Sequence, residues 1–225
     1  MITVHHLDNS RSQRILWLLE ELGLPYEVRH YRRDPRTLLA PASLRAVHPL
    51  GKSPVVTDGE LTLAESGAIV EELLERHGQG RLVPAAGTPE HRRYRYWLHF
   101  AEGSAMPPLL LKLVFERLKN GPVPFFIRPV ARAIANRLLA MLVTPNLARQ
   151  FEFMERELER STWFAGEDFS AADIQMSFPV EAAAGRGGLD GGRHPKLMAY
   201  LRRIHERPAY QRALARGGPY GLAGD

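Results

Sequence analysis

The chain contains no cysteine among its 225 residues. Disulfides, CxxC redox chemistry and thiolate metal sites are therefore excluded, and any thiol chemistry must use a thiol that a ligand brings. The chain also has no apolar run long enough to cross a membrane. Because its first residues lack the charged and apolar segments of a secretion signal, we expect a cytoplasmic protein.

Charge is divided unevenly along the chain, whose formal net charge is +5. Residues 1–80 hold 9 Lys/Arg against 11 Asp/Glu, a net of −2, and the remainder has a net of +7. This indicates two units of different composition. A basic excess can attract an anionic ligand or nucleic acid. Since no dense Lys/Arg tract is present, we expect a solvated helical surface, with no nucleic-acid partner and no membrane partner.

The first 77 residues predict a small mixed sheet with helices packed against it. Two strands, residues 1–7 and 26–31, flank a helix from Arg11 to Gly23, and this βαβ order predicts a parallel pair. Two short β-prone runs follow, with Asp58-Gly59 between them as a hairpin signal. A helix begins near Ser66, which is predicted to be its N-cap. We therefore expect a four-stranded mixed sheet.

Glycine and proline are concentrated between residues 78 and 89, which we interpret as a linker. Beyond it the periodicity is helical almost throughout, so we predict an α/β domain over residues 1–80 and an all-helical domain over residues 88–225. One later helix, beginning at Ile127, has an apolar stripe that consists of Val130, Ala131, Ile134, Leu138 and Leu142. It could lie on a membrane surface, but we expect it to pack inside the helical domain.

Several familiar sites are excluded by the spacing of their residues. Gly51-Lys52-Ser53 looks like the end of a phosphate-binding loop, but Ala46 occupies the position of the required first glycine. His5 and His6 are adjacent on a strand and point to opposite faces, so they cannot share a metal. We expect no metal site.

Three segments are predicted to meet at one end of the sheet. Ser10 lies at the N-terminus of the first helix, whose dipole favours negative charge. The Ser53-Pro54 bond forces extended backbone that can pair with a peptide-like ligand. The helix start at Ser66 offers backbone N–H groups to a carboxylate. Together they predict a site for a small peptide-like anion.

Four motifs in order along the chain resemble those of the cytosolic glutathione transferases, and in particular a serine-type bacterial and fungal branch similar to the yeast Gtt enzymes. The resemblance covers nearly the full length of the chain. The motifs are Asn9-Ser10-Arg11-Ser12-Gln13-Arg14 before Leu18-Leu19-Glu20-Glu21-Leu22-Gly23, His48-Pro49-Leu50-Gly51-Lys52-Ser53-Pro54-Val55, Glu65-Ser66-Gly67-Ala68-Ile69, and Trp163-Phe164-Ala165-Gly166 leading into Phe169-Ser170-Ala171-Ala172-Asp173-Ile174.

This resemblance implies a thioredoxin-like N-terminal domain, an all-helical C-terminal domain, a homodimer, and glutathione as co-substrate without a metal. It also implies a role for each matching residue. Ser10, with Ser12 as its rival, would hydrogen-bond the glutathione sulfur. The remaining contacts would be Lys52 to the glycyl carboxylate, Ser53 before a cis Pro54 to the cysteinyl backbone, and Glu65 and Ser66 to the γ-glutamyl group.

The activity implied is conjugation of the glutathione thiolate to small hydrophobic electrophiles, as in detoxification. Candidate walls of the second-substrate pocket are Met106, Leu110, Phe115 and Phe125, although core packing is an alternative for each. Two other functions stay open. One is glutathione-dependent peroxide or disulfide reduction, in which two glutathiones replace a protein cysteine. The other is a non-catalytic protein of the same fold that binds a ligand or a partner.

Overall fold

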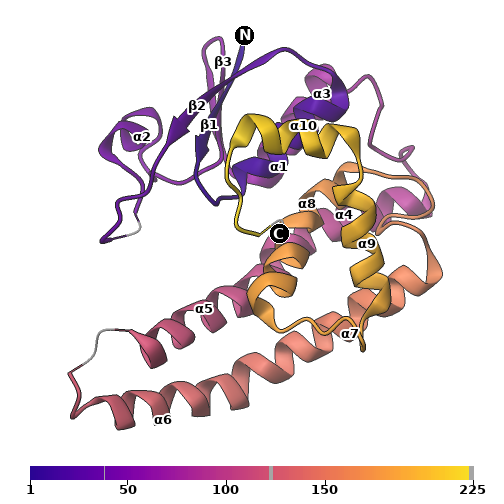
Figure 1. Cartoon of the computed structure of the whole chain (residues 1–225). Coiled ribbons are helices and arrows are strands. Elements are labelled where there is room, and N and C mark those ends of the chain that lie inside the picture. The colour runs from indigo at the N-terminus through magenta and orange to yellow at the C-terminus, as the bar shows by residue number, and fades with distance from the viewer. Residues whose placement is uncertain (38, 122–123, 223–225) are drawn as a thin grey trace.

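The N-terminal part of the chain folds as the mixed four-stranded sheet that the sequence predicts (Figure 1). The computed structural model describes residues 1–37, 39–121 and 124–222. The strands have the order β2-β1-β3-β4, with β1 parallel to β2 and antiparallel to β3, and β3 antiparallel to β4. They are β1 (Ile2–Leu7), β2 (Tyr26–Tyr31), β3 (Val55–Asp58) and β4 (Leu61–Ala64).

Helix α1 (Ser12–Leu22) joins the two parallel strands and ends at Gly23, whose φ of 66° is the left-handed conformation that favours glycine. The helix contacts β1 and α3 (Ser66–His77), and also α8 and α10 of the helical part. Being covered by so many elements, it buries Trp17 and the leucines beside it. A short helix, α2 (Ala42–Val47), precedes the loop that leads to β3. Helix α1 is therefore the central helix of the molecule.

Two local predictions are wrong by one residue. Asp58 pairs with Leu61, so the hairpin loop is Gly59-Glu60 rather than Asp58-Gly59. Asp58 stays in the strand, where it pairs with Ile2 and forms an ion pair with the N-terminal amine at 3.3 Å. The N-cap of α3 is Glu65 rather than Ser66, and the cap makes no side-chain hydrogen bond. A tertiary contact described below occupies the Ser66 hydroxyl instead.

All elements after residue 88 in the described part are helical. Single π-helical turns, η1, η2 and η3, continue α4, α6 and α8. The elements are α4 (Pro89–Phe100), η1 (Ala101–Ala105), α5 (Met106–Asn120), α6 (Arg128–Leu138), η2 (Leu139–Val143), α7 (Thr144–Arg160), α8 (Ala171–Ala182), η3 (Ala183–Gly187), α9 (Pro195–His205) and α10 (Pro208–Gly217). In this part of the chain, no helix is both long and apolar enough to span a bilayer.

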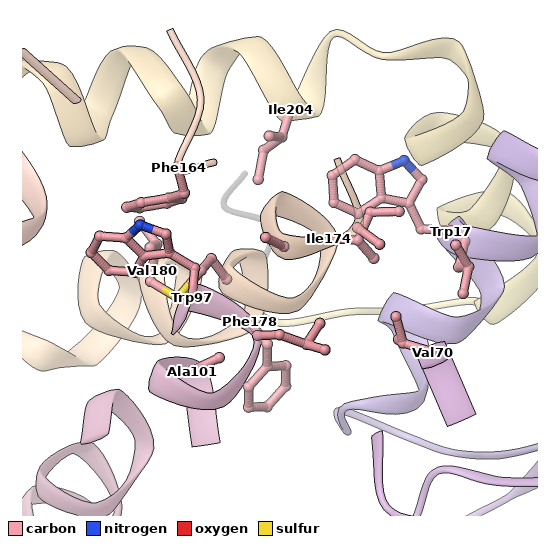
Figure 2. Packing of buried hydrophobic residues seen from close by; sticks show 14 of the residues in the cluster. Trp17, Val70, Trp97, Ala101, Phe164, Ile174, Phe178, Val180 and Ile204 are labelled. Atoms are coloured by element: carbon pink, nitrogen blue, oxygen red, sulfur yellow. The ribbon is translucent and has the colours of Figure 1, made fainter. Parts of the chain in front are cut away.

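One hydrophobic core runs through both parts of the chain. Figure 2 shows Trp17 and Val70, from α1 and α3, in the same cluster as Ile174 and Phe178 of α8. Every residue of α8 is buried. Because the core is continuous and α10 returns to pack on α1, the domain limits at residues 80 and 88 stay a prediction.

The start of α8 has a capping box formed by Ser170 and Asp173, which both belong to the fourth motif quoted above. The Asp173 carboxylate accepts hydrogen bonds from the Ser170 backbone N–H at 3.0 Å, the Ser170 hydroxyl at 3.2 Å and the Phe164 N–H at 2.9 Å. Burial raises the pKa of Asp173 to about 6 against these stabilising hydrogen bonds. The carboxylate thus fixes both the start of α8 and the loop before it.

The apolar stripe of α6 is exposed, so the prediction that it packs inside the domain is wrong. Val130, Ile134 and Leu142 are all exposed, whereas Ala131 and Ala135 are buried. Helix α6 packs on α5. Close packing of two helices uses small side chains as readily as large ones. The apolar pattern indicated a helix correctly and included the buried Ala131, but it was wrong for the large residues Val130, Ile134 and Leu142.

We expect Asp173→Ala to lower the free energy of unfolding by about 3 kcal/mol, because it leaves buried N–H groups without an acceptor. Chemical denaturation followed by circular dichroism measures this change. The matched control is Asp168→Ala, which truncates an exposed aspartate in the same loop and should change stability by less than about 0.5 kcal/mol. Equal effects of the two substitutions would contradict the structural role of the Asp173 carboxylate.

Candidate active site

The strand register brings the three predicted segments to one end of the sheet. Val55 pairs with His5 on one side and with Ala64 on the other. The residues just before Val55 therefore lie between the end of β1 and the residues that follow β4. At this end of the sheet lie the β1–α1 loop with Ser10, the Ser53-Pro54 bond, and Glu65-Ser66 at the start of α3.

Ser53 fastens its loop to the end of β1. The Ser53-Pro54 peptide bond is cis. The Ser53 hydroxyl donates to the His5 carbonyl at 3.0 Å and accepts from the Leu7 N–H at 3.3 Å. It also lies 3.2 Å from the Ser10 Oγ, which donates to it. The Ser53 side chain thus joins the predicted peptide-binding loop to the predicted sulfur-binding serine.

Ser10 and Ser12 belong to one hydrogen-bonded chain that ends on a histidine. The two hydroxyl oxygens are 2.7 Å apart, and the Ser12 Oγ is 2.9 Å from His6 Nδ1. Burial and the neighbouring His30 lower the pKa of His6 to about 4, so its ring is neutral at pH 7. The ring also bonds the Gly217 backbone, which leaves Nδ1 as the acceptor for the Ser12 hydroxyl.

The two serines consequently have different freedom. Ser12 is fully buried and its hydroxyl proton is directed to His6. Ser10 is 5 % exposed, and its oxygen also accepts from the Ser12 N–H at 3.3 Å. The Ser10 hydroxyl can point to either neighbouring serine or turn to a ligand. Of the two serines, Ser10 is therefore the one whose hydroxyl proton is not committed to His6.

A buried arginine holds the start of α3. The Arg14 guanidinium donates to the Ser66 hydroxyl at 2.9 Å and to the Gln175 carbonyl at 2.8 Å, and pairs with Glu102 at 2.5 Å. Arg11 Nε is 3.0 Å from both Glu102 oxygens. Burial opposes the charge of Glu102, but the two arginines outweigh it and keep the pKa of Glu102 below its ordinary value.

Sequence reasoning missed His6 as a partner of the serines, and also Arg14 and Glu102. Arg14 lies within a quoted motif, but nothing local distinguishes it from a solvated arginine. Its contacts reach across 52, 88 and 161 residues to Ser66, Glu102 and Gln175. No local pattern could have predicted them.

The other predicted site residues are more dispersed. Lys52 and Glu65 are both exposed, and Glu65 has a φ of 73°. Of the four candidate walls of the second-substrate pocket, Met106 is buried and Phe115 packs against the core. Leu110 is 54 % exposed on α5, and Phe125 is 79 % exposed in the turn that leads to α6. No group of metal-binding side chains was found among the described residues.

Comparisons with known proteins place the chain in one family. Residues 10–76 match the model "Glutathione S-transferase, N-terminal domain", and residues 125–208 match "Glutathione S-transferase, C-terminal domain". Glutathione S-transferase 3 of Schizosaccharomyces pombe is 37 % identical over 93 % of this chain and 85 % of its own length. Glutathione S-transferase 1 of Saccharomyces cerevisiae is 32 % identical over 93 % of this chain and 92 % of its own.

A crystal structure of a glutathione S-transferase from Actinobacillus pleuropneumoniae is 33 % identical over 99 % of each chain, with a TM-score of 0.74. A further relative, the disulfide-bond oxidoreductase YfcG of Escherichia coli K12, is 28 % identical over 95 % of this chain and 94 % of its own. The thioredoxin-like sheet followed by helices is the fold shared with these transferases. The chain therefore belongs to the glutathione S-transferase family, whose co-substrate is glutathione.

Proposed function

We propose that this enzyme conjugates the thiolate of glutathione to small hydrophobic electrophiles, with the Ser10 hydroxyl stabilising the thiolate. The observation that carries the proposal is the difference between the two serines. The Ser12 proton is held by His6, whereas the Ser10 proton can turn toward a ligand. In the reaction the sulfur attacks the electrophilic carbon, and the leaving group departs with its electron pair.

The energy required is within reach of such a site. A free thiol titrates near ~8.5, and lowering this pKa by about two units needs roughly 2.7 kcal/mol of preferential thiolate stabilisation. One hydroxyl hydrogen bond together with the N-terminus of a helix supplies an interaction of that order. Ser10 precedes α1 by two residues, so both contributions act at one place.

The rest of the glutathione molecule would lie across the same end of the sheet. Lys52 would meet the glycyl carboxylate, the backbone of Ser53 before Pro54 would pair with the cysteinyl unit, and Glu65 and Ser66 would bind the γ-glutamyl group. The Arg14 guanidinium donates a hydrogen bond to the Ser66 hydroxyl. We give Arg14 a positioning role, because it holds the hydroxyl that would contact the ligand.

The second-substrate pocket is proposed beside α5, with Met106, Leu110 and Phe115 on that helix and Phe125 in the turn beyond it. The exposed Leu110 side chain supports this location. A homodimer and a cytoplasmic location are also proposed. Sedimentation equilibrium of the full chain tests the former, and fractionation of the producing cells tests the latter.

Glutathione-dependent disulfide reduction is the second candidate function. The name of the Escherichia coli relative favours it. Because this chain has no cysteine, both electrons would come from two glutathione thiols, which become one glutathione disulfide. Parallel assays with an aryl chloride, an organic peroxide and a mixed disulfide separate the two enzyme activities. Binding of glutathione without turnover of any of them would favour a non-catalytic binding protein.

We expect Ser10→Ala to abolish the ultraviolet thiolate signal that appears when glutathione binds, and to lower kcat/KM for conjugation more than about tenfold at pH 7. Ser12→Ala should retain the signal, because its hydroxyl serves His6 rather than the ligand. Ser104→Ala in η1 is a control outside the site and should behave as the wild type. Loss of the signal in Ser12→Ala alone would assign the role to Ser12 instead.

We expect Lys52→Gln to raise the KM for glutathione by about fivefold, since an exposed ion pair contributes up to about 1 kcal/mol. The kcat at saturating glutathione should not change, because the carboxylate is bound equally in the ground and transition states. Steady-state kinetics at low and high salt measures both values. The matched control is Lys196→Gln, an exposed lysine on α9. An unchanged KM in Lys52→Gln would remove Lys52 from the proposed site.

A further inference from the structure

The turn between α5 and α6 exposes large apolar side chains. Phe125 is 79 % exposed and Phe126 is 69 % exposed, and Ile127 beside them is exposed as well. The same is true of Val130 and Ile134 on the first turns of α6. We name this set the apolar tip: Phe125, Phe126, Ile127, Val130 and Ile134.

The apolar tip is placed where it can reach a flat surface. Figure 1 shows α5 and α6 as a hairpin that extends away from the sheet and from α9 and α10, with the turn at its far end. Within the described residues of the chain, α6 buries only Ala131 and Ala135. The large apolar residues of α6 thus face away from the helix on which it packs.

Positive charge surrounds the apolar tip. From Arg117 to Leu142 the sequence has five Lys/Arg and no Asp/Glu. This net of +5 equals the +5 of the whole chain, so the remaining residues sum to zero. On α6, Arg128, Arg132 and Arg137 are exposed. The basic excess of the chain therefore lies on the segment that carries the apolar tip.

Exposed aromatic and aliphatic side chains on a helix that also carries arginines are typical of segments that bind the interface of an anionic membrane. We propose that the apolar tip docks the protein on lipid bilayers with anionic headgroups. Pairing of two apolar tips would bring together two segments of like charge, so we do not place the proposed homodimer contact there. Peripheral docking requires no spanning helix.

This inference goes beyond the proposed conjugation and does not depend on it. It has one consequence that does rest on the proposed function: apolar electrophiles partition into bilayers, so docking would bring the active site close to dissolved second substrates. It also revises the expectation from sequence that the protein has no membrane partner.

The test is flotation of the full chain with two kinds of vesicle, phosphatidylcholine alone or phosphatidylcholine with about 30 mol % phosphatidylserine. We expect binding to the anionic vesicles at low salt, and much weaker binding to neutral vesicles or at high salt. Phe126→Ser combined with Ile127→Ser, neither of which lines the proposed second-substrate pocket, should lower the partition coefficient at least about tenfold. Arg132→Gln combined with Arg137→Gln should lower it about tenfold or more.

Two controls match these variants. Leu39→Ser removes an apolar side chain that is 62 % exposed in another loop, and Arg29→Gln with Arg36→Gln removes the same charge from the exposed surface of the sheet-bearing part. Both should bind vesicles as the wild type does, and equal thermal midpoints would show that all variants are folded.

Three results would overturn the proposal. One is absence of wild-type binding to the anionic vesicles. Another is equal loss of binding in the variants and their controls. The third is a smaller sedimenting species for the Phe126→Ser, Ile127→Ser variant than for the wild type, which would make the apolar tip a contact between copies of the chain. Conjugation assays on the same preparations report the proposed enzyme activity separately.

Discussion

The ion pair between Arg14 and Glu102 connects the parts of the molecule on which the site depends. A guanidinium that is 1 % exposed is costly to bury unless its charge is matched and its N–H groups are bonded. Glu102 supplies the charge from η1, Ser66 supplies an oxygen from α3, and Gln175 supplies a carbonyl from α8. The Arg14 side chain of α1 thus connects the sheet-bearing part to the helical part.

The same helix positions the hydroxyls at its N-terminal end. Ser10 and Ser12 flank the start of α1, and the bond from Ser12 to His6 fixes which of them retains a free proton. If α1 moved, the sulfur-binding end and the γ-glutamyl end of the proposed site would move together. In the proposed site this would keep the contacts to the cysteinyl sulfur and to the γ-glutamyl group at a set separation, which would lower the entropy cost of binding a flexible ligand.

Most of the fold could be predicted from the sequence because local patterns determine it. The strands, the Gly23 stop and the capping box at Ser170 each depend on residues close together in the chain. The local predictions that were wrong failed because contacts between residues far apart in the sequence decided the outcome. Ser66 does not cap α3 because Arg14 uses its hydroxyl, and α6 turns Ala131 rather than Val130 inward because it packs on α5. The positions of the candidate site serines followed from the family motifs, but their partners His6 and Arg14 could be identified only in the folded chain.

Glu102 lies on the π-helical turn η1, and this location has a geometric consequence. A π turn contains one residue more than the α turn that it replaces, and each residue advances the helix by about 100° of rotation. Deleting one residue there would rotate α5 relative to α4 by roughly that angle, withdrawing the carboxylate from Arg14 and turning the hairpin's outer surface inward. The additional residue of the π turn therefore changes which side chains of α5 face inward relative to those of α4.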